Sequence, residues 1–336
     1  MSPRLCGEKK PKMSEAILQT IELTKIFTAR RGVFGTEKVE NVAVNCVSFW
    51  LEKGETLGLD GESGCGKSTL GLTIMRLYEA DGGRILFDGK DITNADEKYL
   101  KPIRKQMQMI FQDPFASLDP RLTIEQIISE PLEIHGIGTK AERTKIAAEL
   151  LEKVGLSGED LHLFPSEFSG GQQQRIGIAR ALALEPKLII CDEPVSSLDV
   201  SVQAQILNLL RDLQDEFGLS YLFISHNIAV TAFMSRRIGV MYLGKLVEIG
   251  TSRQITDAPR HPYTRELLAA IPEPDPSKRE IETNVEGETN ETSERLNGCV
   301  FYKRCPIAEE TCAVEEPNLR GIDKDRQVAC HFAERN

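Results

Sequence analysis

The sequence lacks any apolar run of the about 20 residues that a membrane-spanning helix needs. Its beginning also lacks the apolar core of a secretory signal, so we expect the protein to stay in the cytoplasm. Residues 1–15 have little apolar content and four basic side chains. We expect them to form a disordered tail, with either Met1 or Met13 as the native start.

An excess of positive charge is absent as well. Lysine and arginine together number 41 against 51 aspartate and glutamate residues, which gives a net charge of −10. This balance argues against a protein that binds nucleic acid through a basic surface. With 40% apolar and 27% charged residues, the composition is ordinary for a soluble globular protein. The 336 residues suffice for one large domain with an appendage.

One glycine-rich stretch has a recognisable chemistry. Residues 61–69 fit the pattern G-x-x-x-x-G-K-[ST], whose backbone N–H groups enclose the phosphates of a nucleotide. Glycines let the backbone approach an anion closely, and the lysine supplies a full charge for the outer phosphates. A glycine-rich turn before a helix is the alternative. The predicted nucleotide-binding residues are Gly61, Glu62, Ser63, Gly64, Cys65, Gly66, Lys67, Ser68 (also a Mg²⁺ ligand) and Thr69.

The segments around this loop support the nucleotide interpretation. Residues 55–59 have the pattern of a short strand and residues 70–77 that of the following helix, which is the order the motif requires. We expect a first half rich in strands with one helix, and then a helical insertion at about 114–170. The apolar runs 188–190 and 221–224 are typical of strands buried on both faces of a parallel sheet. The other expected elements are strands at 16–27, 41–51, 82–89 and 105–111, a loop at 28–40, and helices at 122–134, 140–154, 172–184 and 202–217.

Polar side chains follow the expected strands at their C-terminal ends, where open α/β sheets bind ligands. Asp192 suits Mg²⁺, bound directly or through water, and Glu193 is placed to polarise an attacking water. His226 is a candidate for a hydrogen bond to the γ-phosphate. The alternatives are a solvated acidic turn, a surface histidine and, for Gln112, a polar residue in a turn.

The order of these motifs resembles that of the ATP-binding subunits of ABC transporters, over residues 17–250. The shared elements are the phosphate loop, Gln112, the Phe-Ser-Gly-Gly-Gln run at 168–172, Asp192-Glu193, Ser-Leu-Asp at 197–199 and His226. The run at 168–172 is similar to the LSGGQ signature of that family, with phenylalanine in place of leucine.

The resemblance implies a head-to-tail dimer with two ATP molecules between its subunits. Each ATP then lies between the phosphate loop of one subunit and the signature of the other, which comprises Ser169, Gly170, Gly171 and Gln172. Glu193, His226 and Gln112 are the implied catalytic residues; Gln112 also senses Mg²⁺ and the attacking water. Asp199 communicates across the dimer. Phe27 is expected to stack on adenine, with a core aromatic at a strand end as the alternative.

The residues after 260 narrow the resemblance to the oligopeptide/dipeptide (and nickel) importer branch. His-Pro-Tyr-Thr at 261–264, the run 267–272 and the closing cysteines are similar to that branch. Four thiols in a short cytosolic segment indicate a metal site rather than disulfides, and both zinc and an iron–sulfur cluster suit four thiolates. The branch favours a structural [4Fe–4S] cluster, and four unligated cysteines are the alternative. These residues are Cys299, Cys305, Cys312 and Cys330.

A few positions depart from the family pattern. Asp60 directly precedes the phosphate loop, where a small or apolar residue is usual, and an unpaired carboxylate there would repel phosphate and weaken ATP binding. Asn227 and Arg236-Arg237 replace an acid and an Asp-Arg pair, outside the catalytic set. Cys65 lies near the lysine of the loop, which would lower the pKa of a thiol; the plainer interpretation is a small side chain that fits.

We therefore predict an α/β fold: a P-loop NTPase core of the ABC ATPase type with an N-terminal antiparallel β subdomain, a helical insertion and a small cysteine-rich extension. The expected function is ATP hydrolysis, with Mg²⁺, that powers import of di- or oligopeptides. The expected partners are a second ATPase subunit, identical or homologous, two membrane permease subunits and, indirectly, an extracytoplasmic binding protein, with no nucleic acid. The protein would then be peripheral on the cytoplasmic face of the plasma membrane.

An importer of nickel or another small solute and a non-transport ABC ATPase are the alternative functions. The single cassette, the short insertion and the acidic charge argue against the non-transport class. The predicted domains are the tail at 1–15, the nucleotide-binding domain at 16–250, a helical extension at 251–282, a linker at 283–298 and the four-cysteine segment at 299–336.

Overall fold

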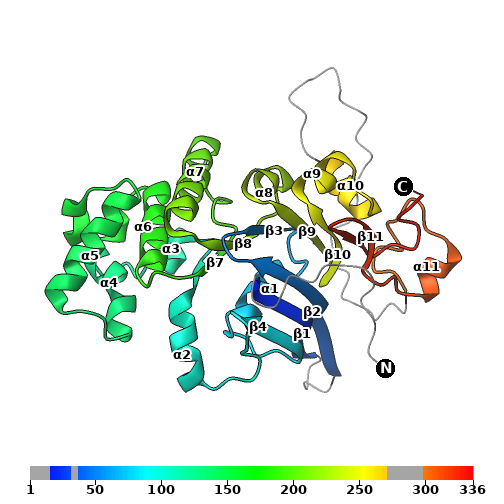
Figure 1. Cartoon of the computed structure of the whole chain (residues 1–336), viewed down its shortest axis with the longest axis horizontal. Helices are drawn as coiled ribbons and strands as arrows, with labels where there is room; N and C mark the ends of the chain where they lie inside the picture. Colours follow the sequence, from blue (N-terminus) through cyan, green and yellow to red (C-terminus); the bar gives the residue numbers. More distant parts are fainter. Residues whose placement is uncertain (1–15, 32–36, 271–297, 336) are drawn as a thin grey trace.

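The computed structural model of the protein describes residues 16–31, 37–270 and 298–335. The predicted tail at 1–15 lies outside this part of the chain, as do residues 271–282 of the predicted extension and nearly all of the predicted linker. Two sheets and a group of helices to one side of them make up the described chain (Figure 1).

An eight-stranded sheet runs through the middle of the molecule (Figure 1). In spatial order its strands are β11 (Arg320–Asp323), β12 (Arg326–Val328), β10 (Lys245–Thr251), β9 (Arg237–Tyr242), β3 (Thr56–Asp60), β8 (Ser220–Ile224), β7 (Leu188–Asp192) and β6 (Met107–Ile110). The strands from β9 to β6 pair in parallel, whereas β10, β12 and β11 add antiparallel strands at the other edge. Every residue of β7 and β8 is buried, as their apolar runs predicted.

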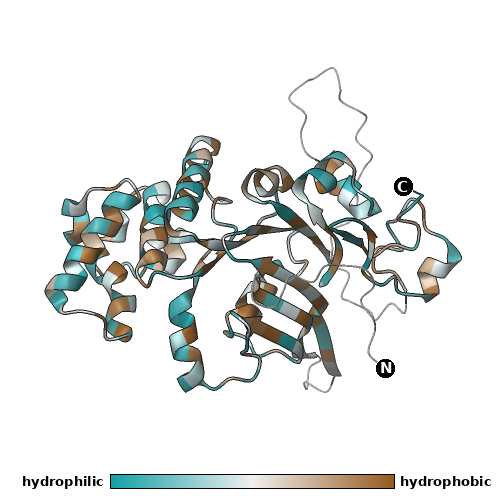
Figure 2. Cartoon of the chain, in the orientation of Figure 1, coloured by the Kyte–Doolittle hydropathy of each residue, from teal (hydrophilic) through white to brown (hydrophobic). Residues whose placement is uncertain are grey.

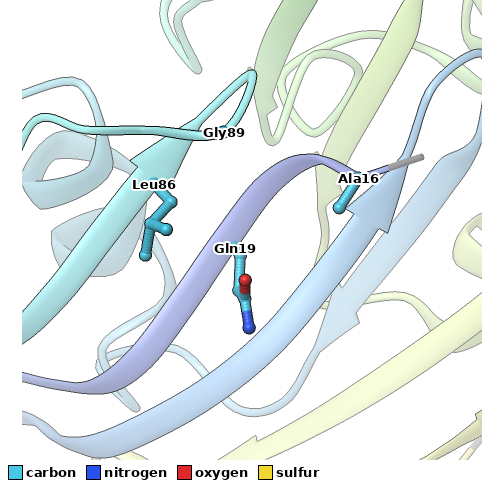
Figure 3. Close-up of a pocket in the computed structure, with 4 residues that line it drawn as sticks. All are labelled: Ala16, Gln19, Leu86 and Gly89. Atoms are coloured by element: carbon cyan, nitrogen blue, oxygen red, sulfur yellow. The ribbon is translucent and has the colours of Figure 1, made fainter. Parts of the chain in front are cut away.

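A second, antiparallel sheet contains β2 (Glu37–Glu52), β1 (Ala16–Arg31), β4 (Gly82–Phe87) and β5 (Lys90–Asp91), in this order. The loop predicted at 28–40 is wrong in its extent, because Thr28 pairs with Glu40 and Arg31 with Glu37. The glycines and charges of this segment suggested a loop, but the backbone ladder between the two long strands continues through it. A small hollow on this sheet is lined by Ala16, Gln19, Leu86 and Gly89, none of them charged, and it suggests no ligand (Figure 3).

Helix α2 (Glu97–Gln106) was not predicted, and the expectation of a single helix in the first half is wrong. Half of its residues are charged and it contains Pro102, so its short amphipathic pattern is hard to recognise in the sequence (Figure 2). Asp96 caps the helix by accepting a hydrogen bond from the Tyr99 N–H, and the helix buries Leu100 and Ile103. As a result, β6 begins two residues later than predicted. The helix after the phosphate loop, α1 (Lys67–Ile74), begins at the lysine itself.

The helical group at the left of Figure 1 follows β6 and, as predicted, residues 114–165, all of them described, contain no strand. Three of its helices begin with a reciprocal capping box, in which Thr123, Thr139 or Ser169 pairs with a Gln or Glu three residues later. Their apolar sides share one core, and their outer sides are hydrophilic (Figure 2). The elements are α3 (Pro114–Ser117), α4 (Ile124–Ile134), α5 (Lys140–Lys153), η1 (Gly158–His162), η2 (Pro165–Glu167) and α6 (Gly170–Leu182).

The remaining helices lie in the second half of the chain. Gly218 ends the first of them in the left-handed conformation, with φ of 64°, as a C-terminal glycine cap does. They are α7 (Val200–Phe217), α8 (Ile228–Met234), α9 (Ser252–Asp257), α10 (Pro262–Ala269) and α11 (Glu310–Val314). None of the helices in the described part of the chain has the length and apolar character that a membrane crossing requires.

The C-terminal segment is joined to the central sheet. Strand β12 pairs with β10, through Glu248 opposite Val328 and Ile249 opposite Gln327. Phe301 and two of the cysteines pack in the same apolar cluster as Tyr242 and Tyr263. This packing places the residues near 300 beside β9 and β10, which lie next to β3 in the sheet. The phosphate loop follows β3, so the C-terminal segment lies close to it.

Candidate nucleotide-binding site

The phosphate loop connects β3 to α1, and glycine is required at both of its ends. Gly61 and Gly66 have φ of 147° and 105°. A Cβ atom would lie 2.2 Å from the Met241 carbonyl oxygen at Gly61 and 2.1 Å from the Ala43 carbonyl oxygen at Gly66. The backbone of neighbouring strands therefore packs directly against the loop, and only glycine fits at these two positions.

The Lys67 side chain is buried and folds back over the phosphate loop. Its Nζ donates to the carbonyl oxygens of Gly61 at 2.6 Å and Glu62 at 2.9 Å. An ammonium group has three N–H donors, and the third is directed at Cys65 Sγ at 3.7 Å, a weak acceptor that a phosphate oxygen could replace. The loop carbonyls thus set where the positive charge points.

Of the three residues predicted at the magnesium ion, Ser68 and Asp192 lie next to each other, and Gln112 bonds to Glu193. The Ser68 hydroxyl donates to Asp192 Oδ1 at 2.8 Å. Burial raises the pKa of Asp192, and the Ser68 hydrogen bond and the nearby Lys67 act in the opposite direction. Hydroxyl and carboxylate oxygens are hard donors that suit Mg²⁺, whose other ligands come from phosphate and water. The residues present therefore fit the ion that accompanies a nucleotide.

The three predicted catalytic residues converge on one carboxylate. Gln112 Nε2 donates to Glu193 Oε2 at 2.9 Å, and His226 Nδ1 lies 3.0 Å from the same oxygen. They follow β6, β7 and β8, neighbouring parallel strands whose C-terminal ends meet at one edge of the sheet. Glu193 has φ of 47°, an uncommon value for a residue with a side chain, and its N–H is held by the Ile224 carbonyl at 2.9 Å. Backbone strain of this kind is typical of functional sites.

Asp60 is fully buried at the end of β3 and faces α8. Its Oδ2 accepts a hydrogen bond from the Thr231 hydroxyl at 2.9 Å, while Oδ1 has no partner. Burial raises the pKa of this carboxyl from 3.8 to about 6, against the opposing influence of Thr231 and Lys67. The carboxylate is therefore paired on one side, and its effect on ATP affinity stays a prediction.

The other departures from the family pattern have structural explanations. Burial raises the pKa of the Cys65 thiol, so the idea of a lowered value is wrong and the interpretation as a small side chain that fits is the better one. The Asn227 side chain caps α8. At the Arg236-Arg237 pair, Arg236 Nη1 lies 3.9 Å from Glu52 Oε2, and the Arg237 guanidinium binds both carboxylate oxygens of Glu55, at 2.8 and 3.0 Å.

The signature run lies at the start of α6, apart from the phosphate loop. Ser169 and Gln172 cap the helix reciprocally, and a Cβ at Gly171 would lie 2.5 Å from Val202 Cγ1. Asp199 caps the adjacent α7, and the Ser201 hydroxyl lowers the pKa of its carboxyl. Within the described residues, no hydrogen bond joins the signature to the loop. The signature and Asp199 thus lie near each other. Neither makes a hydrogen bond with the group formed by Gln112, Glu193 and His226 in the described part of the chain.

Phe27 is half-exposed on β1. Its ring meets that of Tyr78 edge-to-face, with 5.3 Å between centroids, and Lys25 Nζ lies 5.4 Å from its centroid. The partial exposure suits a ring that stacks on a base. The adenine contact nevertheless stays a prediction.

The four closing cysteines lie in the described part of the chain, and all four thiols are free. Burial, with smaller contributions from the nearby Cys312, Cys305 and Cys330, raises the pKa of Cys299 to about 11. Among the described residues, however, no group of three or more His, Cys, Asp or Glu side chains is arranged to hold a metal ion. The structure thus brings the thiols within electrostatic range of one another and gives no support to a zinc ion or a cluster by itself.

Two residues at the loop were missed by the sequence analysis. The Tyr263 hydroxyl accepts a hydrogen bond from the Glu62 N–H at 2.8 Å, and the Arg304 guanidinium binds the Glu62 carboxylate at 2.9 and 3.1 Å. Both belong to segments whose motifs indicate the importer branch. No local sequence pattern indicates that they contact a loop more than 200 residues away. The contacts form because the C-terminal part of the chain packs beside the loop.

Comparisons with known proteins agree with this geometry. Residues 44–196 match the family model described as ABC transporter, and residues 247–312 match the C-terminal region of oligopeptide/dipeptide transporters. The oligopeptide transport ATP-binding protein AppF of Bacillus subtilis is 50% identical over 95% of this chain and 98% of its own length. A probable peptide ABC transporter ATP-binding protein of Sinorhizobium fredii is 49% identical over 95% of this chain and 90% of its own.

Solved structures show the same fold. The ATP-binding cassette MJ0796, in a dimeric post-hydrolysis state with ADP and Pi, is 30% identical with a TM-score of 0.62, over 70% of this chain and 99% of its own. The cbiO1 protein of Clostridium perfringens is 27% identical with a TM-score of 0.62, over 73% of this chain and 92% of its own. The chain therefore belongs to the ABC transporter family, as an ATP-binding subunit of the oligopeptide/dipeptide branch.

Proposed function

We propose that this ABC ATPase powers the import of di- or oligopeptides. The observation that carries the ATPase part is the convergence of Gln112 and His226 on Glu193, one residue from the magnesium ligand Asp192. The peptide cargo is inferred from the relatives named above. They are named as peptide transport proteins, and this chain matches them over nearly their whole length. Import of nickel or another small solute is the alternative cargo.

The residues of the site divide the work of hydrolysis. Lys67 and the loop N–H groups hold the phosphates, and Glu193 orients and polarises the water that attacks the γ-phosphate. Gln112 and His226 fix the Glu193 carboxylate, and His226 is placed to reach the γ-phosphate once the site closes. Ser68 and Asp192 would hold Mg²⁺, which would supply positive charge opposite the phosphates.

We propose that two such subunits, identical or homologous, complete each other's sites. Within one chain, Ser169–Gln172 makes no hydrogen bond to the phosphate loop, although its exposed serine hydroxyl and glycine N–H groups suit a phosphate. In a head-to-tail dimer this run would close over the nucleotide held by the other subunit. The dimeric cassette described above has the same fold, which supports this arrangement.

The partners proposed for the dimer are two membrane permease subunits and, through them, an extracytoplasmic binding protein. We place the ATPase on the cytoplasmic face of the membrane, with the helical group facing the permeases. Nucleic acid is not a proposed partner, because the net charge is −10.

We further propose that the four cysteines hold a [4Fe–4S] cluster. The Cys330 sulfur accepts a hydrogen bond from the Phe332 N–H at 3.4 Å. Such bonds stabilise thiolates and tune cluster potentials. A cluster also holds its thiolates farther apart than a single zinc ion does. This wider spacing suits four thiols that lie near one another but are not arranged around a single ion.

Anaerobically purified protein should be brown, with absorbance at about 400 nm and about four irons per chain. Stoichiometric zinc without iron would contradict the proposal.

The transport function is tested in the assembled complex. Co-expressed with its permeases in a strain that needs imported peptides, the wild-type chain should restore growth on an essential amino acid supplied as di- or oligopeptides. Glu193→Gln should fail to do so while still assembling. Ser166→Ala, at an exposed site, is the matched control and should restore growth. Restoration of nickel uptake without peptide uptake would reject the peptide cargo.

A further inference from the structure

A side chain of the C-terminal cysteine segment reaches into the phosphate loop. Arg304 Nη1 lies 3.1 Å from Glu62 Oε2, and Nη2 lies 2.9 Å from Oε1, so the guanidinium holds the carboxylate with two parallel bonds. The same guanidinium also binds Glu266 on α10. Bidentate pairs of this kind define orientation as well as contributing energy. Arg304 therefore connects the loop to α10.

Aromatic rings hold the guanidinium in place. Its Cζ atom lies 5.6 Å from the ring centroids of Tyr242 and Phe301 and 6.0 Å from that of Tyr263. The side chain is 27% exposed, so solvent screens the pair with Glu62 only in part. The turn that carries Arg304 is itself bonded, through the Arg304 N–H to the Phe301 carbonyl at 3.1 Å. Contacts other than those with the loop therefore also hold the guanidinium in position.

Glu62 is held at three points. Its carboxylate binds Arg304, its N–H donates to the buried Tyr263 hydroxyl at 2.8 Å, and its carbonyl accepts from Lys67 Nζ at 2.9 Å. Lys67 takes its direction from that carbonyl and from Gly61. A residue that fixes Glu62 therefore also fixes the ammonium group that binds phosphate. This sequence of contacts runs from the C-terminal segment to Lys67, the residue proposed to bind phosphate.

We propose that Arg304, together with Tyr263, is a positioning residue of the ATP site: it ties the cysteine segment to Glu62 and keeps Lys67 aligned for phosphate. The C-terminal segment is then a working part of the nucleotide site, and loss of its structure lowers ATP affinity. The proposal holds whatever the four cysteines bind, and it does not depend on the transported cargo.

The test measures ATP affinity and turnover with the full chain. Arg304→Met keeps a long apolar side chain on the aromatic rings and removes the charge, and Glu62→Gln removes the other partner. Each should raise the Kd for ATP by about three- to ten-fold, since a charged hydrogen bond is lost but acts through Lys67. The KM should rise in parallel, with kcat at saturating ATP within about two-fold of wild type, as expected for lost ground-state binding.

Two further variants separate positioning from simple attachment of the segment. Glu266→Gln removes the other partner of Arg304 and leaves the loop bond, so it should leave the Kd unchanged. The double variant Arg304→Met/Glu62→Gln should bind ATP no more weakly than the worse single variant, because both remove one interaction. Arg304→Lys should recover part of the affinity. An unchanged Kd in Arg304→Met, an equal loss in Glu266→Gln, or additive losses in the double variant would each overturn the proposal.

Discussion

The phosphate loop and the signature run are both glycine-rich segments at the start of a helix, yet the fold treats them differently. Lys67 is only 4% exposed, and backbone from β2, from the β9–β10 turn and side chains from the C-terminal segment close around its loop. Ser169 and Gln172 are exposed and make their side-chain hydrogen bonds with each other. The loop is organised by its own chain, whereas the signature presents an open surface.

This difference follows from what each segment must do. Aligning an ammonium group and several N–H groups on phosphate requires a rigid frame, which packing against other elements provides. A segment that acts on the nucleotide of another subunit has to stay accessible until that subunit arrives. Variants in the two regions should therefore affect different steps of the ATPase cycle.

The largest expected effect lies on the loop side. Glu193→Gln keeps the shape of the side chain and its contacts but removes the base that polarises water, so kcat should fall by about 10²- to 10⁴-fold. The Kd for ATP should stay within about two-fold of wild type, because Glu193 contributes to the chemical step. Single-turnover hydrolysis and equilibrium nucleotide binding measure the two quantities. A loss of ATP binding equal to the loss of turnover would place Glu193 in the binding frame instead.

On the signature side, Ser169→Arg should separate binding from hydrolysis. The bulky cation blocks the surface that closes on the nucleotide of the other subunit, and the ATPase rate of the assembled dimer should fall by about 100-fold. ATP binding by the isolated subunit should be unchanged, in contrast to Lys67→Ala, which should abolish it. Weakened binding in an isolated Ser169→Arg subunit would break the distinction between the two regions.

A stability effect of about 2–3 kcal/mol is expected at Asp60, the unsatisfied group beside the loop. Its pKa is about 6 in the folded chain against 3.8 in its usual state, so the folded protein binds more protons between these values. Its favourable contribution is present below pH 4 and is lost as the pH rises through about 6. Asp60→Asn should therefore raise the free energy of unfolding at pH 7.5 and flatten its decline between pH 4 and 6.

Urea unfolding at a series of pH values measures this effect. Asp215→Asn, at an exposed position on α7, is the matched control and should change neither the stability nor its pH dependence. ATP affinity measured on Asp60→Val also tests whether the carboxylate weakens nucleotide binding. An unchanged pH profile in Asp60→Asn would mean that the carboxyl is solvated in solution.

The smallest expected effect concerns the helix cap. Ser169→Ala removes one half of the capping box of α6 and should lower the free energy of unfolding by about 1 kcal/mol. Thr139→Ala, in the equivalent capping box of α5, should cost a similar amount without reducing ATPase activity. Because the Ser169 hydroxyl is proposed to reach the nucleotide of the other subunit, Ser169→Ala should lose more ATPase activity than Thr139→Ala. Equal activity in the two variants would contradict that role.

Much of the site could be predicted because its signals are local. The spacing of glycines and lysine at 61–69 specifies a phosphate loop, and buried strands ending in Asp192, Glu193 and His226 place those side chains at one sheet edge. The helix α2 was missed because its buried face consists of Leu100 and Ile103 among charged residues and a proline. Burial against β6 and the Asp96 cap stabilise it where its own composition does not.

The sequence by itself predicted the chemistry proposed for this protein: the nucleotide loop, the candidate magnesium ligands, the candidate catalytic carboxylate and the signature proposed to act on another subunit. Tertiary structure decided which distant residues support that chemistry. Thr231 meets Asp60 across 171 positions, and Arg304 meets Glu62 across 242. Such contacts depend on how helix and edge strands dock on the sheet, and docking depends on the sum of many weak packing interactions that no short motif records.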